Sequence, residues 1–354
     1  MANKPLKVNM IGYGAMARYH VERMKKSGIM EIVGSYDIWE QRQREAEFDG
    51  FKVFPTSDAL VHDPDCDIVL ITTPNDFHCE YAIAAANAGK HVICEKPVAL
   101  SVDELNRMEK AAKDNGVLFT VHQNRRWDDD FLAIRKIVES GVLGKIYRID
   151  SFVTGANGIP GGWRKIKRQG GGMMLDWGVH LLDQIFQMIE AKPLALWCKY
   201  SYALGFDVDD GFDAKLDFEG DLTVNVRVDT NTFVKMPRWI VYGRDGTATI
   251  EDWDLNGKII LPVYGKEVEI VGIEAGNGYT RTMAYRPHES VTESPIVRPE
   301  FDRDIFYKNF AAAVRGKERQ KVSIESVRKI LRVMELCKIS AEKNIVIKDE
   351  LKNI

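Results

Sequence analysis

Apolar runs of strand length recur through the first third of the chain and alternate with patterns of helical spacing. The strand runs cover residues 8–11, 31–36, 52–54, 66–72, 91–94 and 118–121. The run at 66–72 is apolar almost throughout, which is usual for a strand buried on both faces at the centre of a parallel sheet. Strands that alternate with helices indicate successive βαβ units. Residues 1–123 are therefore expected to form a doubly wound parallel sheet.

The second half of the chain has a different pattern. Apolar and polar residues alternate over 146–153 and 222–228, which is typical of strands with one buried face. Asp245 and Gly246 stand between two further apolar runs and indicate a hairpin. Helical patterns cover 173–189, 303–314 and 324–343. Residues 124–354 are therefore expected to form an α+β domain with a mostly antiparallel open sheet, which makes the whole chain an α/β protein of two domains.

A glycine-rich turn follows the first predicted strand and opens the first predicted helix. It consists of Gly12, Tyr13, Gly14, Ala15, Met16 and Ala17. Gly12 permits a tight turn, Gly14 lets the backbone approach a pyrophosphate, and Ala17 is small enough for the helix to pack on the strand. The helix N-terminus then offers free N–H groups to the phosphates. The alternative is an ordinary turn of an α/β protein, but the order strand, turn, helix, strand and acid predicts a Rossmann dinucleotide site.

Asp37 is the acid in that order, and it ends the second predicted strand. A carboxylate at this position can accept hydrogen bonds from the 2′-hydroxyl of an adenosine ribose, and it repels a 2′-phosphate. We therefore expect the cofactor to be NAD, with NADP the less favoured alternative. Ile38, the next residue, is assigned with Asp37 to the adenosine end of the site.

Composition and charge restrict the kind of partner. The net charge of −3 argues against a nucleic acid or an anionic membrane held by bulk electrostatics, so small molecules remain. The five cysteines are odd in number and include no C-x-x-C pair, which is typical of reduced thiols in a reducing compartment. No apolar run approaches the length of a membrane span, and the first residues do not resemble a signal peptide. We expect a cytoplasmic protein.

Polar residues and a proline follow the predicted strands that end near residues 72 and 94. They are Thr73, Pro74, Asn75, His78, Glu95 and Lys96. Because ligands of doubly wound sheets bind outside the carboxyl ends of the strands, these residues are expected to line the cofactor site. Lys96 can also donate to a substrate oxygen and stabilise negative charge that develops there. The alternative for Lys96 is a solvated lysine at a strand end.

The helical pattern at 173–189 carries a candidate acid/base pair. Asp176 and His180 are i,i+4 neighbours on its polar face. An aspartate beside a histidine favours the imidazolium and orients the ring, and histidine is the natural proton carrier near neutral pH. The alternative is a surface ion pair. Gly178 within the helix and the three glycines at 170–172 indicate that something approaches this face closely.

Further polar side chains are expected at the junction of the two domains. The candidates for substrate binding there are Gln123, Asn124, Arg125, Trp163 and Arg164, beside Lys96, Asp176 and His180. They offer the donors that a sugar or polyol requires, although an ordinary polar loop is the alternative. The remaining histidines are scattered, so His20, His62 and His91 are expected to be structural or surface residues and no metal site is expected.

With the glycine turn, the Glu95-Lys96-Pro97 segment and the Asp176-x-x-x-His180 helix identified, the chain resembles the Gfo/Idh/MocA family. That family includes glucose-fructose oxidoreductase and inositol dehydrogenases. The resemblance implies bound NAD(P), a sugar or cyclitol substrate, and catalytic roles for Lys96, Asp176 and His180. It also implies that the open sheet forms contacts in a homodimer or homotetramer.

The segment from Asn124 to Trp127 is similar to the scyllo-inositol dehydrogenase branch of the family. NADP-preferring members of that branch lack an acid followed by an apolar residue at the end of the second strand, whereas this chain has Asp37 and Ile38. The hypothesis is therefore an NAD(P)-dependent dehydrogenase that moves a hydride between nicotinamide and a secondary alcohol of a sugar or inositol-like polyol. The alternatives are an NAD-dependent glycosidase of the same family and a catalytically silent nucleotide sensor.

Overall fold

The N-terminal part of the protein is a six-stranded parallel sheet, in a computed structural model that describes residues 4–265, 271–283 and 285–354. Its strand order is β3-β2-β1-β4-β5-β6. The strands are β1 (Leu6–Ile11), β2 (Met30–Tyr36), β3 (Lys52–Val53), β4 (Ile68–Ile71), β5 (His91–Cys94) and β6 (Phe119–Val121). The order reverses between β1 and β4, which is where doubly wound sheets bind their ligands. The predicted parallel sheet is confirmed.

Helices connect these strands, as the alternating pattern predicts. They are α1 (Ala15–Ser27), α2 (Glu40–Phe48), α3 (Ser57–Val61), α4 (His78–Asn87) and α5 (Val102–Asp114). The start of α5 is fixed by Ser101, whose hydroxyl accepts a hydrogen bond from the N–H of Glu104 at 3.2 Å. The Glu104 carboxylate in turn accepts from the N–H of Leu100 at 2.8 Å. The start of the helix that follows β5 is thereby fixed.

The second sheet has eight strands in the order β16-β13-β12-β11-β7-β10-β9-β8. They are β7 (Ile146–Thr154), β8 (Pro193–Ser201), β9 (Gly211–Phe218), β10 (Leu222–Asp229), β11 (Trp239–Gly243), β12 (Gly246–Ile250), β13 (Gly257–Pro262) and β16 (Val291–Pro295). Only β7 and β10 pair in parallel, and the other neighbours are antiparallel. Burial alternates along β10, so one face of the sheet is covered. The predicted mostly antiparallel sheet is confirmed.

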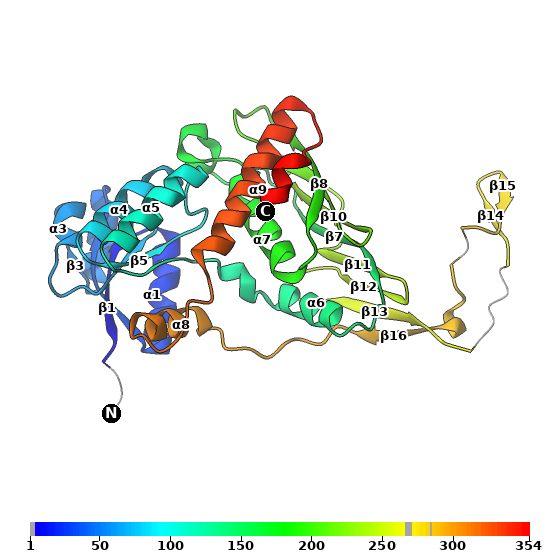
Figure 1. Cartoon of the computed structure of the whole chain (residues 1–354), viewed down its shortest axis with the longest axis horizontal. Helices are drawn as coiled ribbons and strands as arrows, with labels where there is room; N and C mark the ends of the chain where they lie inside the picture. Colours follow the sequence, from blue (N-terminus) through cyan, green and yellow to red (C-terminus); the bar gives the residue numbers. More distant parts are fainter. Residues whose placement is uncertain (1–3, 266–270, 284) are drawn as a thin grey trace.

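Helices α6 (Asp129–Glu139), α7 (Val179–Met188) and α9 (Ile324–Lys343) lie on the side of this sheet that faces the N-terminal sheet (Figure 1). Phe212, Trp239, Leu182 and Leu336 are fully or almost fully buried in the core between these helices and the strands. The active-site candidates on α7 therefore stand on a packed layer that also contacts the N-terminal part.

Helix α8 (Ile305–Val314) returns to the first sheet although it comes late in the chain. Phe306 and Phe310 are buried in the same apolar cluster as Val8 and Ile93. Helix α8 is therefore a later segment that completes the core of the N-terminal part. The domain boundary at residue 123 stays a proposal.

A hairpin arm extends from the far edge of the second sheet, between β13 and β16 (Figure 1). It carries β14 (Ile273–Ala275) and β15 (Gly278–Thr280), which among the described strands pair only with each other. Tyr279 and Tyr285 are 67% and 97% exposed. A lone two-stranded hairpin is marginally stable in water, so an arm with exposed aromatic rings gains from packing against another surface.

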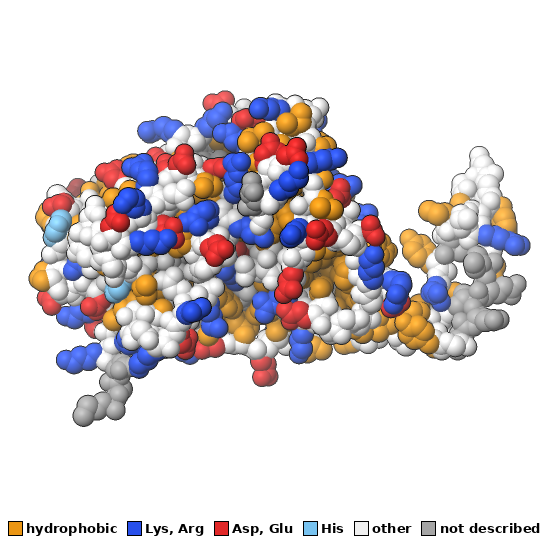
Figure 2. Space-filling model, in the orientation of Figure 1, with side chains coloured by type: hydrophobic (Ala, Val, Ile, Leu, Met, Phe, Trp, Pro, Cys, Tyr) orange, Lys and Arg blue, Asp and Glu red, His pale blue; other side chains and the backbone are white. Residues whose placement is uncertain are grey.

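The face shown in Figure 2 has acidic and basic side chains interspersed, with no extended area of one sign. All five cysteines are buried and free. None of the described helices is both long and apolar enough to cross a membrane.

Candidate active site

The glycine turn has the geometry that a pyrophosphate site requires. Gly12 has a φ of +95°, and a Cβ there would lie 2.9 Å from the carbonyl oxygen of Thr72. A Cβ at Gly14 would meet no atom within 4 Å, so the space above this residue is open, and Ala17 is fully buried against the sheet. The turn therefore fits a dinucleotide whose phosphates lie over Gly14 at the N-terminus of α1.

Asp37 is fixed beside the turn by two backbone groups. Its carboxylate accepts hydrogen bonds from the N–H of Tyr13 at 2.7 Å and from the N–H of Trp39 at 2.9 Å. Ile38 is 68% exposed and leaves an apolar surface next to this carboxylate. Arg42 and Arg44, the nearest cations along the chain, form ion pairs with acids of their own helix, α2. The local charge at the ribose position is therefore set by Asp37.

Several buried polar atoms at the strand ends and on α7 have no hydrogen-bond partner in the described structure. They are Thr73 Oγ1, Asp76 Oδ1, both amide atoms of Gln123, Asn124 Oδ1 and His180 Nδ1. Buried polar groups are nearly always paired, so such a group of unpaired atoms fits bound ligands. Four of these five residues were predicted at the site, and Asp76 was not.

Two other predicted cofactor residues are occupied by protein contacts. The amide of Asn75 donates to the carbonyl oxygen of Gly170 at 3.0 Å, and this bond joins the two parts of the chain. His78 is fully buried between the carbonyl oxygens of Thr73 and Pro97, at 3.0 and 2.9 Å. His78 therefore supports the segments around the site and does not offer a free nitrogen to a cofactor.

Lys96 and Arg164 hold Asp176 between them. The Lys96 ammonium donates to the carboxylate of Asp176 at 3.1 Å and to its carbonyl oxygen at 3.0 Å, and Arg164 donates to the second carboxylate oxygen at 2.9 Å. Burial opposes ionisation of Asp176, but the two cations outweigh it, so its pKa lies below the usual value. Asp176 is thus an ionised anchor for the Lys96 ammonium, which is mostly buried and not a solvated lysine.

His180 is buried, and its ring is held neutral. Burial lowers its pKa well below the usual value, and the positive charges of Lys96 and Arg125 lower it further. The Trp177 ring lies at a centroid distance of 6.0 Å from its ring, nearly edge to face. A neutral imidazole with an unpaired Nδ1 can accept a proton from a substrate hydroxyl at neutral pH.

The prediction that the Asp176 carboxylate orients His180 through a hydrogen bond is wrong. No hydrogen bond joins the two side chains among the described residues, because both Asp176 oxygens are taken by Lys96 and Arg164. The segment Met174–Gly178 forms a π-helical turn before α7, which changes the direction of Asp176 relative to α7. Asp176 therefore positions Lys96, and it does not hold His180 as an imidazolium.

The glycines near this helix are explained by packing of the protein itself. A Cβ at Gly178 would lie 2.6 Å from the sulfur of Met174 and 3.2 Å from the Phe212 ring. A Cβ at Gly170 would approach the Leu100 side chain to 2.5 Å. The close approach inferred from these glycines is present, and it is made by the side chains of Met174, Phe212 and Leu100.

Two of the remaining substrate candidates, Arg125 and Arg164, each lie over a tryptophan ring. The Arg125 guanidinium lies 4.2 Å from the centroid of the Trp177 ring and forms an ion pair with Asp128 at 2.8 Å. Arg164 lies over the Trp163 ring at 4.5 Å. The contacts thus form two groups, Lys96–Asp176–Arg164–Trp163 and Arg125–Trp177–His180. The charge of Lys96 acts on the second group, since it lowers the pKa of His180.

A buried chain of hydrogen bonds behind Lys96 was not predicted from the sequence. One Glu95 carboxylate oxygen contacts His20 Nε2 at 2.8 Å and His122 Nδ1 at 2.6 Å, and the Tyr307 hydroxyl contacts His20 Nδ1 at 2.9 Å. Burial opposes ionisation of Glu95, but the two histidines keep its pKa well below the usual value. These residues are far apart in sequence and share no motif, so no local pattern could have revealed the chain.

The three residues His20, Glu95 and His122 could by type and proximity bind a metal. Both ring nitrogens of His20, Nδ1 of His122 and one carboxylate oxygen of Glu95 already form hydrogen bonds with one another or with Tyr307. His20 is fully buried, as expected for a structural histidine. The chain of bonds fixes the side chain of Glu95, which in turn accepts a hydrogen bond from the N–H of Lys96 at 3.2 Å.

Comparison with known proteins matches both halves of the chain to one family. Residues 6–123 match the oxidoreductase family with an NAD-binding Rossmann fold, and residues 131–249 match the GFO/IDH/MocA C-terminal domain. The solved structure of an NAD-binding protein from Listeria innocua is 40% identical, covers 98% of this chain and 100% of its own, and superposes with a TM-score of 0.95.

Two curated relatives are dehydrogenases of different substrates. The scyllo-inositol 2-dehydrogenase (NADP(+)) of Bacillus subtilis (strain 168) is 26% identical over 93% of this chain and 92% of its own. The D-glucoside 3-dehydrogenase of Escherichia coli (strain K12) is 32% identical over 52% of this chain and 54% of its own. The chain belongs to the GFO/IDH/MocA family of oxidoreductases, with an NAD(P)-binding Rossmann fold.

Proposed function

We propose that the protein is an NAD-dependent dehydrogenase that oxidises a secondary alcohol of a sugar or inositol-like polyol, or reduces the corresponding ketone. The observation that carries this proposal is the pairing of a cation with a neutral base. Lys96 Nζ is held at 3.1 Å from Asp176, and the pKa of the buried His180 lies well below its usual value. An inactive nucleotide sensor would have no use for this pair.

His180 would take the hydroxyl proton of the substrate, because its imidazole is neutral at physiological pH. Lys96 would donate to the same oxygen and stabilise the negative charge that develops on it. Asp176 would position the Lys96 ammonium. When bound, the nicotinamide supplies the hydride acceptor, and the open space over Gly14 fits the phosphates of that cofactor.

The test of this function is reduction of NAD and NADP, followed at 340 nm, across inositols, aldoses, sugar phosphates and glycosides. Formation of NADH with at least one polyol is the expected result. Cleavage of a glycoside without net NADH would support the NAD-dependent glycosidase instead. Unaltered nucleotide across the whole panel would favour the sensor.

We expect Asp37→Ser to shift the cofactor preference toward NADP. The variant loses the hydrogen bonds from the ribose to a charged group, and it loses the repulsion of a 2′-phosphate. The kcat/KM for NAD divided by the kcat/KM for NADP should therefore fall by roughly ten- to a hundredfold. Steady-state kinetics with both cofactors measures this ratio, and Asp58→Ser on the exposed surface of α3 is the control. Equal efficiency of the wild-type protein with both cofactors would contradict the assignment. The Bacillus subtilis relative is named as an NADP(+) enzyme, so this ratio tests whether the two proteins differ in cofactor preference.

We expect the protein to form a homodimer or homotetramer in solution. The hairpin arm exposes Tyr279 and Tyr285, and the second sheet exposes Tyr147 on β7. Such apolar surface is stabilised when a second copy covers it. Light scattering at micromolar concentration should give a mass at or above twice the 40.2 kDa of one chain, and a mass near 40.2 kDa would reject the expectation. A cytoplasmic location is also proposed, since all five thiols are free.

A further inference from the structure

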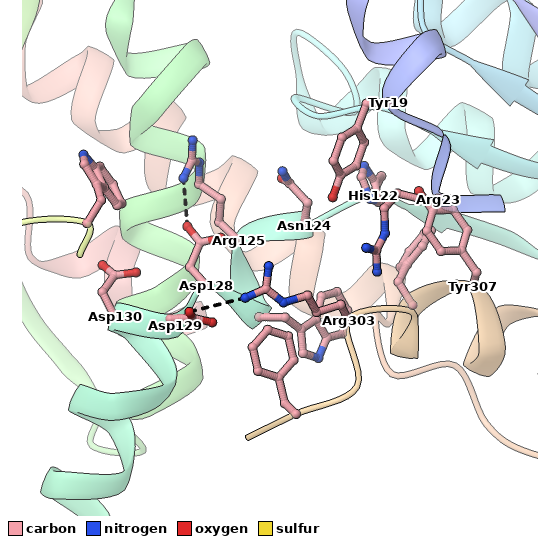
Figure 3. A pocket seen from close by; sticks show the side chains of 14 residues that line it. Tyr19, Arg23, His122, Asn124, Arg125, Asp128, Asp129, Asp130, Arg303 and Tyr307 are labelled. Atoms are coloured by element: carbon pink, nitrogen blue, oxygen red, sulfur yellow. Dashed lines mark hydrogen bonds and ion pairs between the residues drawn. The ribbon is translucent and has the colours of Figure 1, made fainter. Parts of the chain in front are cut away.

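A cavity of about 370 Å³ lies between α1, the start of α6 and the segment before α8. Figure 3 shows its side chains, with His122, Tyr19 and Arg23 on one side and Arg125 and Asp128 on the other. Neither Lys96 nor His180 belongs to its lining. A space of this size is within the range of small-molecule sites. Because Lys96 and His180 do not line it, a group bound here would not be the one that reacts.

The cavity adjoins the catalytic residues at two points. Arg125 lines it and also stacks on Trp177, whose ring lies at a centroid distance of 6.0 Å from that of His180. His122 lines it and shares Glu95 with the N–H of Lys96. Arg125 and Trp177 thus connect the cavity to His180, and His122 and Glu95 connect it to the backbone of Lys96.

Charged side chains of the cavity already have ion-pair partners, either within the lining or on residues outside it. The ion pairs are Arg125–Asp128 at 2.8 Å, Arg303–Asp129 at 3.6 Å, Arg238–Asp130 at 3.1 Å and Arg23–Asp304. An anionic or cationic ligand would have to break such pairs and leave partly buried charges without partners, which is costly. The cavity therefore suits a neutral ligand.

Ring faces and polar atoms complete the lining. The aromatic residues are Tyr19, Trp127, Trp253, Phe301, Phe306 and Tyr307. His122 is 3% exposed, its Nδ1 donates to the ionised Glu95, and in the described part of the chain no hydrogen bond uses its Nε2, which is left without a partner. Asn124 Oδ1 is buried without a partner. Aromatic faces together with polar atoms that can bond hydroxyl groups match a sugar ring, which has apolar C–H faces and hydroxyls at its edge.

We propose that this cavity binds the second ring of a glycoside whose first ring is oxidised between Lys96 and His180. This inference rests on the proposed function and narrows its substrate class from single-ring polyols to glycosides. His122 Nε2 and Asn124 Oδ1 form hydrogen bonds with hydroxyls of the second ring, and Tyr19 and Phe301 pack against its faces.

The first test compares matched single-ring and two-ring substrates with the full-length protein and NAD. Glucose is compared with cellobiose, maltose and phenyl glucoside, and myo-inositol with galactosyl-inositol. For at least one pair the two-ring compound should have a kcat/KM roughly tenfold higher, as one well-packed ring contact provides. No gain for any pair would overturn the proposal.

The second test uses Tyr19→Ala and Phe301→Ala, both at partly exposed positions on the cavity wall. Each should lower kcat/KM for the preferred two-ring substrate by about three- to tenfold and leave the single-ring value within about twofold. Phe48→Ala, at a 91% exposed position on α2, is the matched control and should change neither. Equal losses for one-ring and two-ring substrates would overturn the assignment.

Binding calorimetry separates this inference from the proposed function. Cellobiose, maltose and phenyl glucoside are titrated into the NAD-saturated protein and into Phe301→Ala. Oxidation of single-ring polyols without tighter binding of any two-ring compound rejects the inference and leaves the function intact. Two-ring binding that Phe301→Ala weakens, without any NADH, rejects the function and supports the cavity assignment.

Discussion

His180→Ala should lower kcat for polyol oxidation by roughly 10²–10⁴-fold, which is the usual contribution of a positioned proton carrier. The imidazole is buried and neutral, because burial and the charges of Lys96 and Arg125 hold its pKa well below the usual value. It can therefore take the substrate proton throughout the neutral pH range. The affinity for NAD should be nearly unchanged, since the glycine turn and Asp37 lie on other elements.

Single-turnover and steady-state kinetics with a substrate identified at 340 nm measure this loss, and NAD titration by fluorescence checks the fold and the cofactor site. His62→Ala, at an exposed position on the N-terminal part, is the control and should retain full activity. If His180→Ala kept most of the wild-type rate, the proton carrier would have to be sought in Lys96 or His122.

The fold could be predicted because its signals are local and periodic. The apolar run of β4 and the alternation along β10 each follow from the face that the strand buries. The return of α8 to the first sheet could not be predicted in the same way. Phe306 and Phe310 are apolar at helical spacing, and that pattern shows that the helix buries a face but not which sheet covers it.

The site could be predicted as a set of residues but not as a set of contacts. Lys96, Asp176 and His180 were found from motifs, yet helical spacing alone paired Asp176 with the wrong partner. The π-helical turn at Met174–Gly178 and the approach of Arg164 are tertiary features with no signature in i,i+4 spacing. The chain from Tyr307 through His20 to Glu95 joins residues from separate elements, so only the folded structure brings it together.

The last prediction concerns Lys96, whose charge has two separate effects. Lys96→Met removes the donor that stabilises the developing alkoxide, so kcat and kcat/KM should fall together by roughly 10²–10³-fold. It also removes a positive charge that lowers the pKa of His180. That pKa should therefore rise in the variant, because the imidazolium is no longer repelled by a neighbouring ammonium.

The pH profile of oxidation distinguishes the two effects of Lys96. Wild-type kcat should be constant through neutral pH and fall only below the lowered pKa of His180, where the base becomes protonated. In Lys96→Met the acid limb should move to higher pH, whereas Lys110→Met, an exposed lysine on α5, should leave both rate and limb unchanged. A rate loss without any movement of the limb would mean that Lys96 acts on the substrate oxygen alone. An unchanged kcat would remove Lys96 from the reaction and return it to a purely structural ion pair with Asp176.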